Sequence, residues 1–338
     1  MSTGDTITYK QGGICFRVDD NRPAHQWTAF AEIFDRHGYK FCAALCPARM
    51  IDDADYLDLV RKLQSGGHEV MDHTPIHSVD KLPLRPEADA DAWRRLPGVD
   101  HVDDEFIYLT YEPIAAGSYP TGSADVSGKV ISAGRPGDLA DMGPPKYFAL
   151  WLPDLDTVCR FDEKAEKDGT TIELRSFWGE DNVALGTHKG VTYHKLQKED
   201  VRITLDARKR LAETSLELFE ACGLERPVTW IQPGSGGCSN FDREAARTCF
   251  GDLYDYVSAA TYPDRSLKCY NEHDPLGDKR FGMMWGNFND EAKDLDWNKK
   301  RIADGVAKHH VLIGHSHFAE GVMPDGWDGY LRRVDAIL

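Results

Sequence analysis

The chain has 338 residues and a formal net charge of −16 at pH 7. Nucleic acids and anionic membranes bind cationic surfaces, so we expect neither as a partner. No run approaches the roughly 20 apolar residues of a membrane span. The first residues predict no signal peptide, and the eight cysteines form no CxxC pair. We therefore expect a cytoplasmic protein, with secretion as the alternative if an export signal was removed; the oligomeric state stays open.

Short apolar strands alternate with amphipathic helices in two parts of the chain. Strands are expected at residues 13–18, 41–45, 69–72, 228–231, 256–260, 281–285 and 310–313. Helices are expected at residues 24–37, 54–63 and 205–222, among others. This alternation predicts an α/β fold with a parallel sheet that is covered on both faces. Seven strands favour a barrel, complete or incomplete, over an open sheet.

Residues 79–204 break this alternation. They are rich in Pro, Gly and Asp at first and then carry β-type runs at 106–111, 147–151 and 170–174. A structureless loop of this length is improbable in a compact domain. We therefore expect an inserted, mainly β subdomain at 79–204, between the two parts of a barrel formed by 1–78 and 205–338.

Two histidines four residues apart follow the third predicted strand. Thr74 suits the N-cap of a helix and Pro75 its first position, which would place His73 and His77 one turn apart on one face. Asp19 and Asp20 end the first strand. Two imidazoles and one carboxylate make a ligand set for one divalent metal with an open position. Alone, the histidine pair also fits a helix start on the surface.

Further polar residues follow the later strands. In a (β/α) barrel, reactive residues gather at the carboxyl ends of the strands. There, one aspartate would bind the metal and its neighbour would take a proton from water. The glycine-rich turn 232–237 has two interpretations. Its backbone N–H groups could donate hydrogen bonds to an oxyanion that forms during the reaction, or it is a tight turn without a catalytic role. His315 or His317 would protonate a leaving group or simply pack.

The Asp19-Asp20 pair, the hexad from His73 to Ser78 and the run Leu312–His315 resemble the polysaccharide deacetylase family, carbohydrate esterase family 4. The resemblance covers residues of about 10–80 and 205–338. It implies a distorted (β/α)7 barrel with Asp20, His73 and His77 as ligands of one divalent ion. Zn²⁺ is expected first, with Co²⁺, Ni²⁺ or Mn²⁺ as alternatives.

The resemblance also implies catalytic roles and a substrate. Asp19 would be the base, His315 the general acid, and the N–H of Gly234 part of the oxyanion hole. The implied reaction is the removal of acetyl groups from an acetylated carbohydrate, with N-acetyl groups as the favoured target. Candidate substrate contacts are Pro233, Trp285, Trp297 and His317.

The chain departs from the family at two positions. Ile231 stands where the family has an arginine that pairs with the catalytic aspartate, so Asp19 must be oriented from elsewhere or activity is altered. Asn21 replaces a glycine, and asparagine tolerates a left-handed backbone.

Other functions remain open. Gly314–His317 and Gly251–Asp255 also resemble parts of the two-metal site of metallophosphoesterases. A carbohydrate-binding barrel without activity, or a hydrolase of another amide, would fit the same fold. Aromatic residues of the insert, including Tyr108, Tyr111 and Trp151, would stack on sugar rings or form the core of a small sheet.

Overall fold

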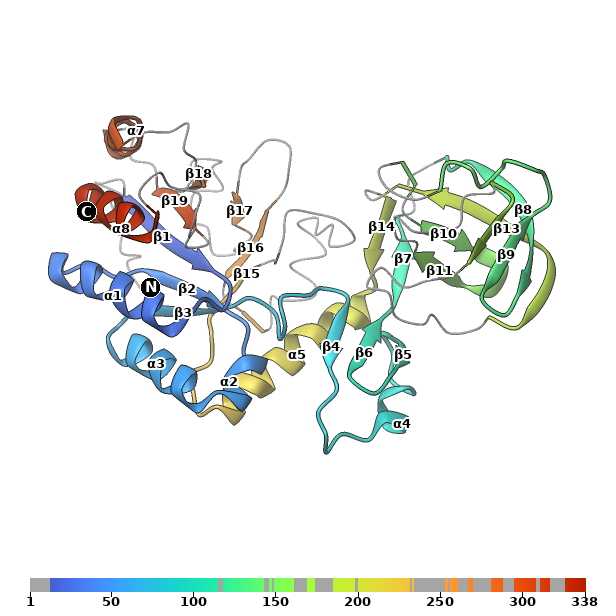
Figure 1. Cartoon of the computed structure of the whole chain (residues 1–338), viewed down its shortest axis with the longest axis horizontal. Helices are drawn as coiled ribbons and strands as arrows, with labels where there is room; N and C mark the ends of the chain where they lie inside the picture. Colours follow the sequence, from blue (N-terminus) through green and yellow to red (C-terminus); the bar gives the residue numbers. More distant parts are fainter. Residues whose placement is uncertain are drawn as a thin grey trace, which may run out of the picture. The chain divides into compact units, whose positions relative to one another are not determined.

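The computed structural model describes most of the chain as two compact units. The described residues are 13–114, 118–142, 146–147, 149–160, 169–173, 185–197, 200–231, 233, 253–254, 256–260, 267–269, 281–287, 295–307, 311–316 and 326–338. The first unit holds those up to Ser78 and from Leu211 onward, and the second holds Val79–Arg210 (Figure 1). In the strands from residue 256 to residue 316, only the backbone is described.

The first unit is built on one eight-stranded sheet. Its order is β17 (Leu267–Cys269), β16 (Tyr256–Ala260), β15 (Thr229–Ile231), β3 (Glu69–Asp72), β2 (Cys42–Leu45), β1 (Gly13–Asp19), β19 (Val311–Ser316) and β18 (Phe281–Asn287). Six ladders are parallel, and only the one between β16 and β17 is antiparallel. All seven strands predicted from the sequence are therefore present in one mainly parallel sheet, which confirms the α/β class.

The strand order is that of a seven-stranded barrel opened between β16 and β18. Strand β17 occupies the edge beside β16, and no ladder among the described residues joins it to β18. The sheet therefore has the order of a barrel, while the closed (β/α)7 barrel remains an expectation.

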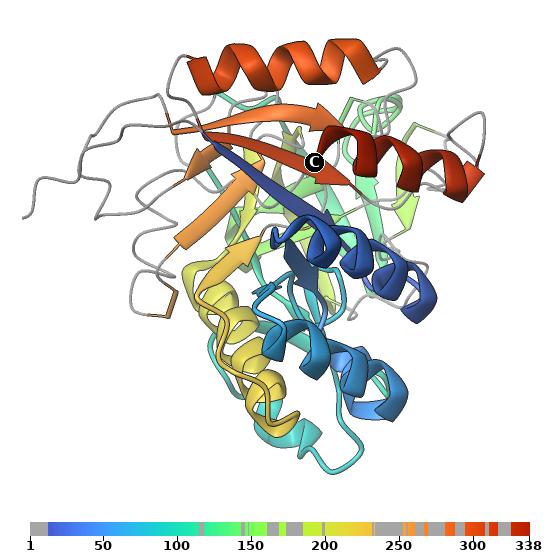
Figure 2. The ribbon, with the colours of Figure 1, turned by 90° about the vertical axis from the view of Figure 1, so that its left-hand side faces the viewer.

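Helices surround this sheet. They are α1 (Ala24–His37), α2 (Ala48–Asp52), α3 (Ala54–Ser65), α5 (Leu205–Ala221), α7 (Leu295–Ala307) and α8 (Gly326–Ile337). Figure 2 shows α7, α8, α1 and α3 following one another around the outside of the strands, and each is in contact with the next. Helix α1 ends at His37 and is followed by Gly38, whose φ of 71° is the left-handed conformation typical of a helix C-terminus. No described helix is long and apolar enough to cross a membrane.

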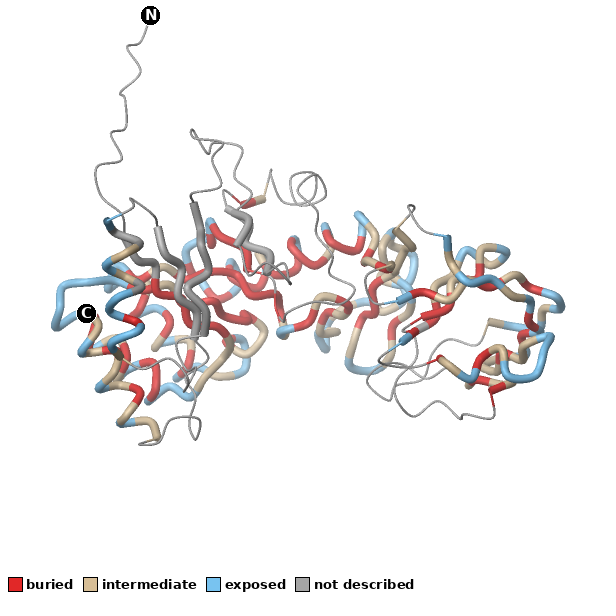
Figure 3. Tube along the Cα trace, turned by 90° about the horizontal axis from the view of Figure 1, so that it is seen from above, coloured by how far each residue is buried: buried red, intermediate tan, exposed pale blue. Residues whose placement is uncertain are grey.

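The two faces of β1 differ in chemistry. Successive side chains of a strand point to opposite faces, and Phe16 and Val18 are buried in the core together with α1, α3 and α8. Arg17 and Asp19 therefore lie on the other face. In the neighbouring strands that face carries a small apolar cluster of Ala44, Met71 and Ile231. On the side of β1 that pairs with β2, the strands β2, β3 and β15 are almost wholly buried (Figure 3).

The second unit contains three further sheets. One has the order β11 (Thr157–Arg160), β10 (Ala149–Leu152), β13 (Thr187–Leu196), β8 (Thr121–Ser127), β9 (Val130–Ala133) and β12 (Thr171–Glu173). The others are β14 (Val201–Ile203) with β7 (Tyr111–Pro113), and β4 (Lys81–Pro83) with β6 (Phe106–Leu109) and β5 (Val99–Val102). All the ladders described in these sheets are antiparallel. The short helix α4 (Ala90–Trp93) precedes β5, and the 3₁₀ turn η1 (Pro153–Leu155) follows β10.

Candidate metal centre

Asp20, His73 and His77 lie together at the carboxyl ends of β1 and β3. Their ligand atoms are all within 4.8 Å of one another. Oδ1 of Asp20 lies 2.9 Å from Nε2 of His77 and 3.4 Å from Nε2 of His73. The side chain of His73 is 2% exposed and that of His77 is 47% exposed, so the cluster is open to solvent on one side. The structure thus brings together the three residues that the sequence predicted as metal ligands.

The histidines do not lie on a helix, so that interpretation of the sequence is wrong. Thr74 has a φ of 67° and His77 a φ of 60°, and both values are incompatible with a right-handed helix. The backbone N–H of Thr74 donates to Oδ1 of Asp72 at 2.8 Å, an Asx-type turn that competes with helix formation. The two imidazoles therefore meet across consecutive turns, with ring centroids 4.9 Å apart.

Unusual backbone conformations concentrate at this cluster. Four described residues other than glycine have positive φ, and three of them are Asp20 (76°), Thr74 and His77. Such conformations are unfavourable for L-residues, most of all for β-branched threonine, and persist where the surrounding structure enforces them. Asn21, which stands where the family has a glycine, does not have a positive φ. Its amide instead joins the backbone of Cys46, with N–O distances of 2.9 Å.

A buried polar network lies directly beneath His73. Asp72 is 0% exposed and accepts hydrogen bonds from the hydroxyls of Ser215 (2.5 Å) and Tyr254 as well as from Thr74 N–H. Complete burial raises the pKa of the Asp72 carboxyl to about 6, although these hydrogen bonds act in the opposite direction. The sequence analysis did not identify this network; its only local signal is an aspartate at the end of an apolar strand.

The electrostatics of the cluster couple Asp20 to the imidazoles. Burial alone would raise the pKa of the Asp20 carboxyl, but His73 and His77 outweigh it and hold that pKa well below its usual range. In return, contact with Asp20 raises the pKa of His77 above its ordinary value. Oδ2 of Asp20 accepts a hydrogen bond from Arg22 at 2.8 Å.

The donor set fits a divalent metal such as zinc. Zinc bonds to nitrogen and oxygen are about 2.0–2.2 Å long, which puts two ligands of a tetrahedral ion about 3.3 Å apart. The distances of 2.9 and 3.4 Å from Asp20 Oδ1 to the two nitrogens are close to that value. Oδ1 is also a buried atom that receives no well-aligned hydrogen bond from the described residues. A cation between these atoms would satisfy it.

Asp19 lies next to this cluster and is held by Arg17. Nε of Arg17 is 2.7 Å from Oδ1 of Asp19, and Nη2 is 2.8 Å from Oδ2. Both side chains are buried. Arg17 was not identified from the sequence, although the spacing Arg-Val-Asp on a strand places the first and third side chains on one face.

The remaining predicted site residues are only partly described. Pro233 is buried just after β15, and Trp297 in the first turns of α7 is 38% exposed. Trp285 lies in β18 and His315 in β19, but their side chains are not described. The two others, Gly234 and His317, lie outside the described residues. The roles of all six stay predictions.

The described residues do not support the metallophosphoesterase alternative. That alternative also requires an Asp-x-His motif near the start of the chain. The candidate, Asp35-Arg36-His37, lies in α1, where Asp35 pairs with Lys40 (2.5 Å) and His37 with Asp335 (2.7 Å). Asp252 and His317, which would complete the site, lie outside the described part of the chain.

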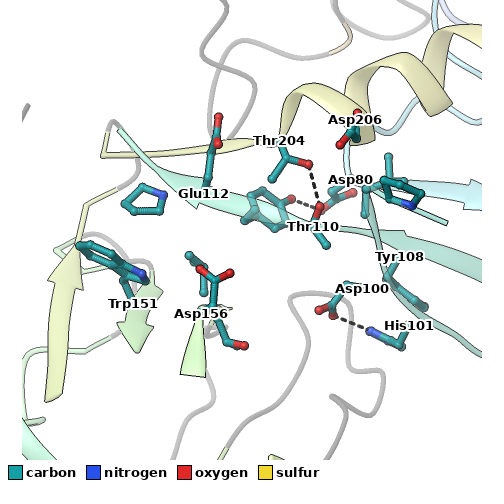
Figure 4. Close-up of a pocket in the computed structure, with 17 residues that line it drawn as sticks. Asp80, Asp100, His101, Tyr108, Thr110, Glu112, Trp151, Asp156, Thr204 and Asp206 are labelled. Atoms are coloured by element: carbon teal, nitrogen blue, oxygen red, sulfur yellow. Dashed lines mark hydrogen bonds and ion pairs between the residues drawn. The ribbon is translucent and has the colours of Figure 1, made fainter. Parts of the chain in front are cut away.

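A separate pocket of about 470 Å³ lies within the second unit. Figure 4 shows Trp151 and Tyr108 at its wall with several carboxylates, among them Glu112 and Asp156. Many of its polar groups already have partners: Asp80 accepts from Tyr111, Asp100 lies 2.8 Å from the His101 ring, and Thr110 bonds Thr204. Three aromatic residues of the insert, Tyr108, Tyr111 and Trp151, line this pocket. None of the predicted site residues does.

Comparison with known proteins finds similarity only among solved structures. No family model matches the chain, and no curated protein matches it. One similar structure is that of a mutant of a CE4 family pseudoenzyme with restored enzymatic activity. It has 7% identity and a TM-score of 0.40 over 98% of this chain. The chain spans 64% of that protein's length.

A second similar structure is that of a peptidoglycan N-acetylglucosamine deacetylase in complex with 4-naphthalen-1-yl-N-oxidanyl-benzamide. It has 9% identity and a TM-score of 0.39 over 98% of this chain and 81% of that one.

Proposed function

We propose that this chain is a metal-dependent hydrolase that removes acetyl groups from a carbohydrate, with N-acetyl groups as the favoured target. The observation that carries the proposal is the position of Asp20 Oδ1, buried and within 2.9 and 3.4 Å of two imidazole nitrogens. This arrangement supports a single divalent ion held by three protein atoms with further positions open. That is the ligand number of catalytic rather than structural zinc sites.

Each residue has one role in the proposed reaction. Asp20, His73 and His77 hold the ion. A divalent ion held by these residues would supply Lewis-acid chemistry, polarising a carbonyl group and lowering the pKa of water. Asp19 takes a proton from the attacking water, and His315 returns a proton to the leaving amine. The N–H of Gly234 donates to the developing oxyanion.

The pairing of Asp19 with Arg17 supports the choice of base. A carboxylate that accepts two hydrogen bonds from a guanidinium is held in one orientation, as a general base must be. Burial excludes competing solvent from this side chain, because Asp19 is 4% exposed. A carboxylate free to rotate on the surface would have neither property.

The direct test is acetate release by the metal-loaded full chain. Substrates are chitooligosaccharides, peptidoglycan fragments, acetylated xylan and small acetylated amides, each with and without chelator. Release that stops with chelator and returns with zinc supports the proposal, and the best substrate identifies the acetylated compound. Binding of a glycan without release from any substrate favours the carbohydrate-binding alternative and rejects the hydrolase.

The identity of the metal needs its own measurement. Two imidazoles and a carboxylate also suit Co²⁺, Ni²⁺ and Mn²⁺, since selectivity among these ions depends on geometry and availability as well as ligand type. Metal analysis of the purified chain, followed by reconstitution with each ion, ranks them by activity. We expect one ion per chain with zinc among the most active; two ions per chain would favour the metallophosphoesterase alternative.

A further inference from the structure

The ion pair between Arg17 and Asp19 follows from their places on β1. The two residues are separated by one position, so their side chains project from the same face of the strand, roughly 7 Å apart at the backbone. The long arginine side chain covers that distance and meets the carboxylate with two parallel contacts, of 2.7 and 2.8 Å. The whole pair is inside the protein, with side-chain exposures of 7% and 6%.

We infer that Arg17 is the positioning residue for Asp19, a role that rests on the proposed function. The fork of a guanidinium matches the two oxygens of a carboxylate and fixes the plane of the group. An ionised carboxylate has about four lone-pair directions, of which the fork occupies two. The fork therefore fixes the plane in which the Asp19 carboxylate would accept a proton.

The same geometry distinguishes the roles of the two neighbouring aspartates. Arg17 engages both oxygens of Asp19. Arg22, which is partly exposed, engages only Oδ2 of Asp20 and leaves Oδ1 facing the imidazoles of His73 and His77. Asp20 therefore keeps a free oxygen for the ion, whereas Asp19 is held as a neighbour that does not bind it.

Ile231 of β15 stands where the resembled family has an arginine, and its apolar side chain cannot form an ion pair with Asp19. Ile231 is 1% exposed and packs with Ala44 and Met71 on the face of the sheet that carries Arg17 and Asp19. Its backbone carbonyl contacts the ring of His73. The guanidinium that pairs with Asp19 therefore comes from Arg17 on β1 and not from β15.

The test compares Arg17→Met and Arg17→Lys with Arg36→Met, a matched control that removes the exposed ion pair between Arg36 on α1 and Asp335 on α8. All are measured as zinc-loaded full chains. We expect Arg17→Met to lower kcat about 10- to 100-fold, as the loss of an orienting partner does, with KM within about twofold. Zinc stoichiometry and Kd should stay near wild type, because the hydrogen bonds described for the Arg17 side chain go to Asp19 and not to the three ligands. Arg17→Lys keeps the charge but not the fork and should recover part of the rate.

Crystal structures of the zinc-loaded variants provide a readout that does not depend on activity. We expect the Asp19 carboxylate to leave its wild-type orientation in Arg17→Met while Asp20, His73 and His77 stay in place. Wild-type kcat in Arg17→Met, or an unmoved Asp19, overturns the inference. A parallel loss of zinc overturns it as well, because it would mean a general structural role.

Two outcomes require a further comparison: misfolding of Arg17→Met and inactivity of the wild-type chain. If Arg17→Met does not fold, Arg17→Lys decides: a lower kcat with zinc retained supports the inference, and an unchanged kcat overturns it. If the wild-type chain releases acetate from no substrate, the proposed function fails. The orientation of Asp19 in the variant structures then still decides whether Arg17 sets it.

Discussion

The imidazole of His73 is held between the ends of two strands. Its Nδ1 atom lies 3.1 Å from the carbonyl oxygen of Ile231, and its Nε2 atom lies 3.4 Å from Oδ1 of Asp20. A proton on Nδ1, donated to that carbonyl, leaves the lone pair of Nε2 free on the side of Asp20. This is the arrangement by which proteins fix the tautomer and ring orientation of a metal-binding histidine.

Loss of a ligand should weaken zinc binding. His73→Ala and Asp20→Asn each remove one of the three atoms that surround the proposed ion, and we expect zinc Kd to rise at least about 10- to 100-fold. Isothermal titration of the metal-free protein measures this directly. His37→Ala, which removes an exposed histidine on α1 that pairs with Asp335, is the control and should bind zinc normally. Equal zinc affinity in His73→Ala and wild type would reject the site.

Asp19→Asn should separate metal binding from turnover. Asparagine keeps the size of the side chain but is not a base, and general-base catalysis typically contributes about 10²- to 10⁴-fold. We expect kcat to fall within that range while one zinc ion per chain is retained. Metal analysis and acetate release on the same preparation provide both numbers. A wild-type rate in Asp19→Asn would reject the assigned base.

Zinc binding should weaken as the pH falls. Metal binds the neutral imidazole, so protons compete with it. The neighbouring Asp20 carboxylate raises the pKa of His77 in the metal-free protein, so this competition begins at a higher pH than for an ordinary histidine. Titrations from pH 8 to pH 5.5 should show decreasing affinity, with protons released on binding. Affinity that is constant across this range would show that no imidazole binds the ion.

The polar network beneath His73 should matter for stability. Ser215→Ala removes one of the three described hydrogen-bond donors to the fully buried Asp72 carboxyl, and losing a hydrogen bond at a buried polar group costs about 1–3 kcal/mol. Denaturant unfolding of the metal-free protein should show a decrease of that size in the free energy of unfolding. Ser65→Ala, at an exposed hydroxyl near the end of α3, is the matched control. An effect no larger than the control's would mean that the network contributes little.

Chelation should lower the thermal stability of the purified protein. A ligand that binds only the folded state stabilises it by about 2.7 kcal/mol when its free concentration is 100 times Kd. Zinc should therefore raise Tm in wild type, and it should do so much less in Asp20→Asn. Differential scanning calorimetry with EDTA and with added zinc tests this. A Tm that does not change with zinc would contradict folding-linked metal binding.

The elements of the first unit were predictable because their signals are local. Helix α1 covers the predicted residues 24–37, and strand β16 covers the predicted residues 256–260. Periodic apolar residues and the glycine that follows α1 carry this information within a few positions of the chain. The positions of Asp20 and His73 at strand ends followed from the same pattern, because parallel strands bring their carboxyl ends to one edge.

The turn at residues 74–77 could not be predicted in the same way. Thr74 and Pro75 are good residues for a helix start, yet Asp72 captures the N–H of Thr74 and the backbone turns left at Thr74 and His77. Asp72 itself is held by Ser215 and Tyr254, which are more than a hundred residues away in the chain. Long-range contacts therefore overrode the local preference.

The sequence by itself determined the α/β class and the strands of the sheet, since these depend on hydrophobic periodicity. Residue types at strand ends made Asp19, Asp20, His73 and His77 candidates, and the family resemblance selected Asp20 as the metal ligand. Only the tertiary structure decided how the donors meet and which arginine holds Asp19. Both depend on pairs of atoms a few ångströms apart, within a sheet whose neighbouring strands are distant in the chain. Hydrophobic periodicity predicts which face of a helix or strand is buried, but it does not predict which side chain of another helix or strand packs against that face.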